Sequence, residues 1–357
     1  MSVKNTVILA VTGLLSFLIS AWAGKAVIPW LHKLHFGQTI LEIGPSWHQS
    51  KQGTPTMGGL LFIGSSTVAL LVAVAVCALT GLRTLFGVPY AAARLIAGVA
   101  LALGCAAIGF IDDYIKVVKK RNKGLSPLQK LFLQLLLSAA YATVLYIYGH
   151  GAFKIPFFGN VEWGVWYIPF TMFVVVAMTN ATNLTDGVDG LCGMTGFIAA
   201  LALLLLSGIA GAYGECLMSV ALAGGLAGFL LWNLHPARVF MGDTGSLFIG
   251  GTLTAIAFGI EQPFLLVPVG ILYIAENLSV ILQVGYFKLT HGKRLFKMSP
   301  LHHHFELCGW SENKIVVVFS AVTLLGGLAA VLLGLYAYAA KQRRKGARHT
   351  MENGKKA

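Results

Sequence analysis

Long apolar segments recur along almost the whole chain, and they constrain its fold more than any other feature. Of the 357 residues, 57% are hydrophobic and only 11% are charged, whereas about 25% of the residues of a soluble domain carry a charge. Runs of about 18 apolar residues are long enough to cross a bilayer as helices. Inside lipid the backbone must satisfy its own hydrogen bonds, which leaves helices or closed barrels. Because the runs are continuous rather than alternating, the sequence predicts an all-α, polytopic membrane protein.

We expect about ten transmembrane helices, separated by short Gly/Pro or polar connections. The expected spans are 5–24, 57–80, 91–111, 128–149, 165–182, 191–210, 216–234, 246–260, 263–287 and 314–340. They form one integral membrane domain, residues 1–340, followed by a basic tail, residues 341–357, that we expect to be disordered. The first apolar stretch is long for a signal peptide and continues into Lys25 and Pro29, so we interpret it as a membrane helix.

Basic residues divide the connections into two sides. One side, which holds 25–56, 112–127, 183–190, 235–245 and 288–313, contains two basic clusters, whereas the internal connections of the other hold little beyond Arg83 and Lys154. The positive-inside rule makes the first side cytoplasmic. The basic tail disagrees, because parity places it outside, so its side and role stay open. The net charge is +13, and the basic residues lie in the loops between spans, where they typically face lipid headgroups. We therefore expect no nucleic-acid partner.

The chain has only five aspartates, and all of them lie at span ends or loops on the predicted cytoplasmic side: Asp112, Asp113, Asp186, Asp189 and Asp243. Avoidance of lipid explains why they lie in loops, but not why they share one side. Asp112 and Asp113 end an apolar run, and a basic cluster follows them. One carboxylate can face a cleft while the other pairs with Lys116 or Lys119. Lys130 lies one turn into the next span, where it can meet a phosphate or extend to the membrane surface.

Four polar residues end the fifth span at intervals of three: Asn180, Asn183, Asp186 and Asp189. On a helix or 3₁₀ turn this spacing makes one polar stripe. Amide and carboxylate groups together suit a nucleobase or a sugar. The alternative is a polar helix end with capping residues and glycine turns, but capping needs one such residue rather than four.

Asp243 stands between Gly242 and Gly245, just before a helix that Ser246 is placed to cap. Such a loop offers backbone N–H groups and the positive end of the helix dipole to a phosphate. A carboxylate there can hold Mg²⁺, with substrate phosphates completing the coordination. An ordinary capped turn is the alternative. No P-loop or dinucleotide-binding motif is present in the sequence.

Three consecutive histidines, His302, His303 and His304, occupy the last predicted cytoplasmic loop. On a helix their side chains spread over about 200° of arc, so they cannot all bind one ion, and no further ligand completes a zinc site. We expect His302 and His303 to donate hydrogen bonds to a phosphate or nucleotide. The third histidine can pack inward or pair with Glu306.

These motifs resemble those of the phospho-N-acetylmuramoyl-pentapeptide transferase family, within the polyprenyl-phosphate N-acetylhexosamine-1-phosphate transferase superfamily. The likeness occurs in the same order along essentially the whole chain, in 53–59, 110–117, 180–191, 239–251, 278–285 and 300–310. Only the N-terminus and the basic tail depart from the family pattern. The resemblance implies a ten-helix homodimeric enzyme of the bacterial cytoplasmic (inner) membrane, with a cytoplasmic active-site cleft.

The implied reaction moves phospho-MurNAc-pentapeptide from UDP-MurNAc-pentapeptide to undecaprenyl phosphate in the membrane lipid, giving lipid I and UMP, and it requires Mg²⁺. The resemblance implies that Asp243 binds the metal and that Asp112 and Asp113 are catalytic. It also implies a substrate site made of Lys51, Lys116, Lys130, Asn183, Asp186, Gly187, Asp189, Phe240 and Gln283. The residue patterns add His302 and His303 to the catalytic set, and Asn180, Gly242, Ser246 and His304 to the substrate site.

Alternatives stay open at this stage. The lipid phosphate can attack directly, which we favour, or an aspartate can attack first and form an acyl-phosphate. A related enzyme that moves GlcNAc-1-phosphate from UDP-GlcNAc would share the aspartates. An ion-coupled transporter is a more distant alternative, since the ninth span contains Pro263 and Pro268 and the polar residues Glu276 and Asn277. We expect that span to form a wall of the groove for the lipid tail, with its polar residues facing a cavity or another helix.

Overall fold

The structure is a computed structural model that describes residues 2–33, 53–81, 89–119, 123–149, 151–155 and 157–354. The predicted substrate residue Lys51 lies outside these ranges. The elements of the N-terminal half are α1 (Val3–Lys33), α2 (Gly59–Leu79), α3 (Pro89–Val118), α4 (Pro127–Gly149), β1 (Ala152–Ile155), β2 (Gly159–Glu162), η2 (Gly164–Trp166) and α5 (Tyr167–Thr185). Those of the C-terminal half are α6 (Leu191–Ala210), α7 (Tyr213–Asn233), α8 (Gly242–Gly259), η3 (Pro263–Leu265), α9 (Leu266–Val269), α10 (Ile271–Leu289), α11 (Leu301–Glu306) and α12 (Glu312–Gly354).

The predicted all-α membrane fold is confirmed, but the number of qualifying spans is smaller than ten. Among the described residues, eight helices are long and apolar enough to cross a membrane. A ninth candidate is a broken pair, Pro263–Val269 and Ile271–Leu289, bent by 80°. The remaining expected span corresponds to α8, which falls outside this count because Gly, Thr and Asp243 dilute its apolar residues.

α8 occupies the centre of the helical bundle. It contacts α2, α3, α5, α6 and α7, and every residue from Thr244 to Gly259 is buried. Close helix approach explains why so central a helix is rich in small residues. A Cβ at Gly109 of α3 would lie 2.2 Å from the carbonyl oxygen of Asp243, and one at Gly250 would lie 2.5 Å from Thr182 Oγ1. The crossing of α3 and α8 at Gly109 brings the two aspartate-bearing helix ends together.

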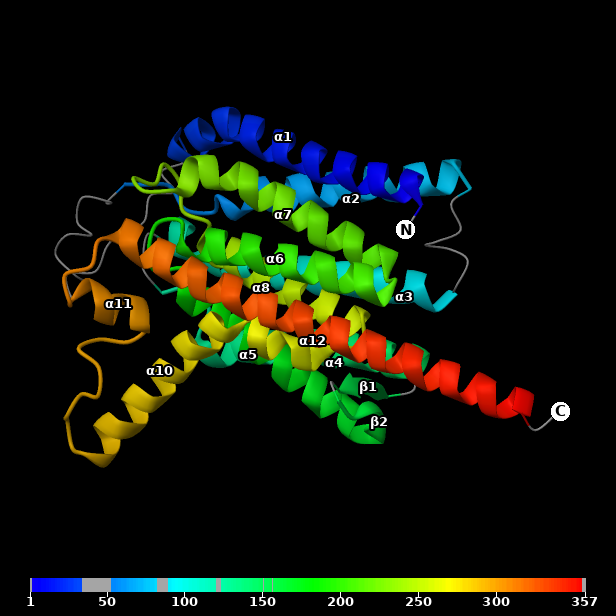
Figure 1. Cartoon of the computed structure of the whole chain (residues 1–357). Helices are drawn as coiled ribbons and strands as arrows, with labels where there is room; N and C mark the ends of the chain where they lie inside the picture. Colours follow the sequence, from blue (N-terminus) through cyan, green and yellow to red (C-terminus); the bar gives the residue numbers. More distant parts are fainter. Residues whose placement is uncertain are drawn as a thin grey trace.

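The ninth expected span divides into η3, α9 and α10, and α10 turns away from the bundle (Figure 1). Pro263 and Pro268 lie before the bend, where their missing N–H groups weaken a continuous helix. Glu276 on α10 is fully buried, and its carboxylate accepts a hydrogen bond from the backbone N–H of His302 on α11. The prediction that Glu276 faces another element is therefore confirmed.

Different elements lie at the two ends of the helical bundle. Both chain termini and the hairpin β1–β2 lie at one end, and α11 lies at the other (Figure 1). The hairpin is antiparallel, pairing Ala152 with Glu162 and Ile155 with Gly159, and it was not expected from the sequence. Beside it, Glu261 pairs with both Arg94 and Lys154. The predicted separation of the termini from loop 288–313 agrees with this arrangement.

α12 continues past residue 340 and runs to Gly354, and the expected disorder of the basic tail stays a prediction. The helix extends past the other helices at the end that carries the termini (Figure 1). Residues 339–345 are Ala, Lys, Gln and Arg, which are strong helix formers.

Candidate active site

Three carboxylates converge where α3 crosses the start of α8. Asp112, Asp113 and Asp243 each offer an oxygen, and these oxygens all lie within 4.8 Å of one another. Asp112 and Asp113 are buried, at 3% and 2% exposure. The sequence predicts all three on one side of the membrane, and the structure brings them to one point. We name these three residues the carboxylate cluster.

Two lysines bridge the carboxylate cluster. Lys116 Nζ lies 2.6 Å from Asp112 Oδ2, 3.1 Å from Asp243 Oδ2 and 3.7 Å from Asp113 Oδ1. Lys130 Nζ lies 2.7 Å from Asp243 Oδ2. The expectation that one carboxylate pairs with Lys116 while its neighbour faces a cleft is therefore wrong, because one turn of α3 lets Lys116 reach both. Three carboxylates and two ammonium groups leave one negative charge in excess.

Asp243 stays ionised because of these lysines. Its burial opposes ionisation, but the charges of Lys130 and Lys116 outweigh that effect and hold the pKa of Asp243 well below its usual value. Asn183 of α5 also donates a hydrogen bond of 2.9 Å to Asp243 Oδ1. An ionised, oriented carboxylate is the kind of group that binds a hard divalent cation.

Asp113 caps the N-terminus of α8. Its Oδ1 accepts a hydrogen bond of 3.2 Å from Asp243 N, and its Oδ2 accepts bonds of 2.9 and 2.7 Å from Thr244 N and Oγ1. Gly242 begins α8 with φ +70°, and a Cβ there would lie 2.5 Å from Asp113 Oδ2. Two of the N–H groups that the sequence predicts for a phosphate thus donate to a carboxylate of α3. The predicted phosphate site at the start of α8 stays a prediction.

Ser246 does not cap α8, contrary to the prediction. It lies one turn inside the helix, where its hydroxyl donates to Gly242 O at 3.1 Å and accepts from Asn183 Nδ2 at 2.9 Å. Ser246 and Asp243 thus hold the same amide from two sides. Ser246 therefore orients the Asn183 side chain and does not accept a hydrogen bond from the N–H groups at the start of α8.

Asp112 anchors the segment that precedes α4. Its Oδ1 accepts a hydrogen bond of 2.7 Å from Leu125 N, while its Oδ2 contacts Lys116. A Cβ at Gly124 would lie 2.4 Å from Asp112 Oδ1, so the backbone there passes directly over the carboxylate. Asp112 therefore fixes the start of the helix that carries Lys130 into the cluster.

The predicted polar stripe of α5 divides in two. Asn183 faces the carboxylate cluster, but Asn180 donates instead to Gln134 Oε1 of α4 at 2.9 Å. α5 ends at Thr185, and Asp186 has non-helical dihedrals, so Asp186 and Asp189 leave the helical register. Burial, followed by the charges of Asp243, Asp113 and Asp189, raises the pKa of Asp186 well above its usual value.

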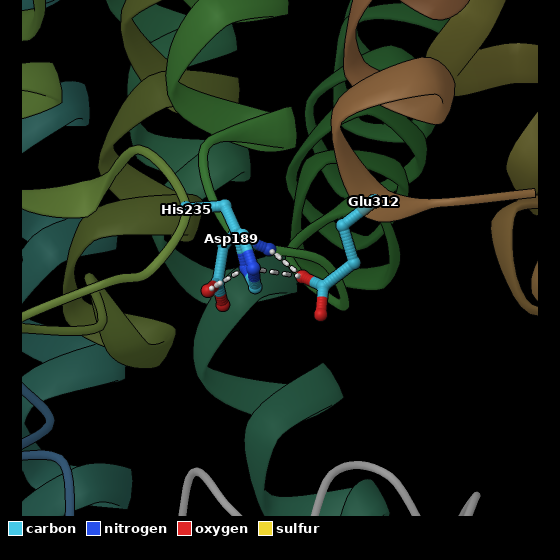
Figure 2. Close-up of side chains that lie close together, drawn as sticks. All are labelled: Asp189, His235 and Glu312. Carbon is cyan, nitrogen blue, oxygen red and sulfur yellow. Dashed lines mark hydrogen bonds and ion pairs between the residues drawn. The ribbon is translucent and has the colours of Figure 1, made fainter.

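Asp189 joins a second group, which we name the histidine-bridged cluster: Asp189, His235 and Glu312. Figure 2 shows the three side chains pointing toward one another. His235 Nδ1 lies 3.0 Å from Asp189 Oδ2 and 3.7 Å from Glu312 Oε2. Backbone N–H groups complete it, since Ala237 N donates to Asp189 Oδ2 and Asp189 N donates to Glu312 Oε2. Sequence reasoning missed His235 and Glu312, because neither lies in a motif with a spacing signal.

The histidines point differently from the prediction. His302, not the third histidine, faces inward: it is 1% exposed and its Nδ1 lies 3.2 Å from Glu276 Oε1. Its Nε2 has no hydrogen-bond partner within the described chain, and a Cβ at Gly187 would lie 2.1 Å from it. His302 therefore lies between two elements. Its Nδ1 faces Glu276 of α10, and its Nε2 faces Gly187 in the loop that follows α5.

His303, rather than His304, pairs with Glu306, at 2.6 Å between Nδ1 and Oε2. His304 Nδ1 instead accepts a hydrogen bond of 3.1 Å from Lys297 N, and its ring packs against Phe296. The side chains of the three histidines therefore point in three different directions from α11. Their predicted roles toward substrate stay predictions.

The two remaining predicted substrate residues have backbone partners. Gln283 of α10 accepts hydrogen bonds from Leu295 N and Phe296 N at 3.0 and 2.9 Å and donates to Phe296 O. Phe240 N donates to Pro55 O, and Phe240 O accepts from Gly58 N, both at 2.8 Å. Gln283 thus holds the loop before α11, and the Phe240 backbone ties the start of α8 to the segment before α2.

Comparison with known proteins relates this geometry to one family. Residues 95–260, which contain the carboxylate cluster, match the family described as Glycosyl transferase family 4. Residues 51–63 match the phospho-N-acetylmuramoyl-pentapeptide-transferase signature 1. A phospho-N-acetylmuramoyl-pentapeptide-transferase of Clostridium perfringens (strain 13 / Type A) is 43% identical over 312 residues, 87% of this chain and 94% of the relative. Proteins of that name from Listeria monocytogenes serotype 4b (strain CLIP80459) and Desulforamulus reducens are 40% and 43% identical over 90% and 89% of this chain, and 96% and 93% of their own lengths.

Proposed function

Because the chain belongs to the phospho-N-acetylmuramoyl-pentapeptide-transferase family, we propose that it makes lipid I. It transfers phospho-MurNAc-pentapeptide from UDP-MurNAc-pentapeptide to undecaprenyl phosphate and releases UMP. This is the first membrane step of peptidoglycan synthesis. The names of the relatives favour this reaction over transfer of GlcNAc-1-phosphate from UDP-GlcNAc.

The lysine-bridged carboxylate cluster is the observation that carries the proposal. The attacked diphosphate and the attacking lipid phosphate are both anionic, so cationic groups must neutralise them as they approach. Lys116 and Lys130 stand within 3.1 Å of Asp243 Oδ2. Each ammonium group can exchange a carboxylate oxygen for a phosphate oxygen without leaving the cluster.

The cluster also fits Mg²⁺, which we propose as the cofactor. Mg²⁺ prefers oxygen ligands and is usually held by one or two carboxylates together with substrate phosphates. Both oxygens of Asp113 accept hydrogen bonds from the N-terminus of α8. Asp243 would therefore be the principal Mg²⁺ ligand, with Asp112 beside it. When bound, the ion would neutralise charge on the transferring phosphate.

We favour direct attack by the lipid phosphate over an aspartyl-phosphate intermediate. A phosphate monoester has its second pKa near 6, so it is largely a dianion at neutral pH and needs little help from a base. Asp112 and Asp113 both use their carboxylate oxygens in the structure, Asp112 with Leu125 N and Lys116, and Asp113 with α8. These contacts support roles in positioning. An acyl-phosphate trapped with UDP-MurNAc-pentapeptide alone would contradict direct attack.

The lipid tail needs an apolar surface beside the cluster, and we propose that α10 forms it. Leu278, Ile281 and Leu282 project from this helix with 49%, 58% and 53% exposure. Because α10 turns away from the bundle, this apolar face is open along its length. We place the active site on the cytoplasmic side of the bacterial inner membrane, in a homodimer.

A donor assay tests the proposed reaction. Purified protein receives undecaprenyl phosphate, Mg²⁺ and either UDP-MurNAc-pentapeptide or UDP-GlcNAc, and UMP release is measured together with the lipid product. We expect lipid-dependent UMP release from UDP-MurNAc-pentapeptide only. Release from UDP-GlcNAc alone would refute the assignment.

A further inference from the structure

A polar cavity lies outside the active site, between α1, α7 and the loop after α7. Its volume is about 560 Å³, and its lining includes Trp22, Lys25, Trp232, His235 and Arg238. The segments that line it, the second half of α1 and the C-terminal end of α7, lie toward the end of the bundle that carries α11 (Figure 1). Of the residues that line it, only His235 has a role described above, in the histidine-bridged cluster.

The cavity presents two basic side chains, Lys25 and Arg238. Lys25 Nζ lies 5.1 Å from the centroid of the Trp22 ring, and Arg238 Cζ lies 5.8 Å from that of Trp232. Both basic residues are exposed, and neither forms an ion pair within the described chain. The described lining contains no Asp or Glu. Asp189 and Glu312, the acids that contact His235, have side chains only 2% and 12% exposed.

Apolar side chains form the other part of the cavity wall, and Trp232 is held in place. Trp232 Nε1 donates a hydrogen bond of 3.2 Å to Ala21 O, and a Cβ at Gly24 would lie 2.2 Å from the same nitrogen, so the indole lies flat on α1. Beside it, Trp22, Leu231 and Leu234 expose 71%, 60% and 42% of their surface. Exposed apolar side chains therefore meet exposed cations at one edge of two membrane helices.

We propose that this cavity binds the phosphate headgroup of an anionic phospholipid. Lys25 and Arg238 would contact the phosphate, and the acyl chains would lie on Trp22, Leu231 and the adjoining face of α1 and α7. Basic pockets between membrane helices recognise anionic headgroups, and Trp at this level anchors the headgroup boundary. The apolar edge selects a lipid over a free phosphate ion. The proposal is independent of the reaction, because none of these residues belongs to the carboxylate cluster.

Native mass spectrometry of the full-length protein, titrated with phosphatidylglycerol or phosphatidylcholine, tests the site. The double variant Lys25→Gln/Arg238→Gln removes both cations, and Lys288→Gln is the matched control, since Lys288 is exposed on α10 away from the cavity. A cation near the membrane surface contributes about five-fold in lipid affinity. We therefore expect the double variant to weaken phosphatidylglycerol binding about 25-fold, with no change for Lys288→Gln or for phosphatidylcholine.

The charge-preserving variant Lys25→Arg/Arg238→Lys separates charge from folding and should bind phosphatidylglycerol like the wild type. Inorganic phosphate, added as a competitor, should displace the lipid only weakly. Unchanged phosphatidylglycerol binding by the double glutamine variant would overturn the proposal. Equal binding of phosphatidylcholine, or full displacement by inorganic phosphate at lipid concentration, would overturn it as well.

Discussion

The carboxylate cluster and the histidine-bridged cluster have similar acidic residues but opposite surroundings. In the first, Asp112, Asp113 and Asp243 share two ammonium groups. In the second, Asp189 and Glu312 surround one imidazole and accept backbone N–H groups (Figure 2). The first lies where two long helices cross, and the second joins the ends of three segments. Both sets satisfy the geometric requirement for a cation site.

This difference indicates which cluster performs chemistry. Ammonium groups are mobile donors that can pass from carboxylate to phosphate oxygens as an anionic substrate arrives. Backbone N–H groups cannot move without moving the chain, so a carboxylate that accepts from them, as Asp112, Asp113, Asp189 and Glu312 do, holds structure in place. Asp243 differs from these four, because it contacts Lys116, Lys130 and the amide of Asn183. We propose that the carboxylate cluster handles phosphate and metal through Asp243 and the two lysines, and that the histidine-bridged cluster positions the loops beside it. Four substitutions test this division, in order of decreasing effect.

Lys130→Met should have the largest effect. It removes the ammonium group 2.7 Å from Asp243 Oδ2 and keeps most of the side-chain volume. Loss of one preorganised charge at a reacting group typically lowers kcat by about 10²–10³-fold. UMP release under saturating donor measures it. Lys119→Met, an exposed residue just beyond the end of α3, is the control, and near-normal activity of Lys130→Met would contradict the division.

Asp113→Ala should mainly destabilise the fold. It leaves the N–H groups of Asp243 and Thr244 at the start of α8 without their acceptor. Orphaned buried donors cost about 1–3 kcal/mol each, so two of them should cost about 2–6 kcal/mol of stability. Unfolding of the detergent-solubilised protein measures this loss. Asp113→Asn keeps one acceptor oxygen and should lose less; equal loss in both variants would show that capping is not the role of Asp113.

Glu312→Gln should act on binding rather than on chemistry. The amide still accepts the hydrogen bond from Asp189 N, but the substitution removes the carboxylate charge 3.7 Å from His235 Nδ1. We expect about 1 kcal/mol lower stability and a rise in KM for the nucleotide donor, with kcat nearly unchanged. Steady-state kinetics separates the two constants. A collapse of kcat with unchanged KM would move Glu312 into the catalytic group.

His304→Asn should have the smallest effect, because His304 belongs to neither cluster. Its Nδ1 accepts only the backbone N–H of Lys297, and the asparagine oxygen can replace that acceptor. We expect a change of about 0.5 kcal/mol or less in stability and activity close to that of the wild type. An activity loss comparable to that of Lys130→Met would place His304 at the substrate instead.

Much of the fold was predictable, because helix formation in lipid depends on local composition. Apolar runs in the sequence predict the helices, and basic loops predict that Asp112, Asp113 and Asp243 share one side of the membrane. The side chain that caps each helix end could not be predicted. Asp113 rather than Ser246 caps α8, since the α3–α8 crossing at Gly109 brings that carboxylate to the helix end.

Contacts between residues far apart in the sequence could not be predicted either. His235 lies 46 residues from Asp189, and Glu312 lies 123 residues from it, so no spacing joins them. The three histidines were predicted as a substrate motif, but their directions depend on where α11 begins relative to α10. The bend of 80° before α10 decides that placement. Proline predicts a weak point in a helix, but not the direction in which the helix then turns.

The most direct test of the carboxylate cluster is UMP release by Asp243→Asn under Mg²⁺ titration, with Asp189→Asn as the matched control. The substitution keeps the size of the side chain and removes the charge that the lysines hold in place. We predict that no Mg²⁺ concentration restores Asp243→Asn to within about 100-fold of wild-type activity, whereas Asp189→Asn keeps the wild-type Mg²⁺ dependence. Normal activity and normal Mg²⁺ dependence of Asp243→Asn would contradict the account.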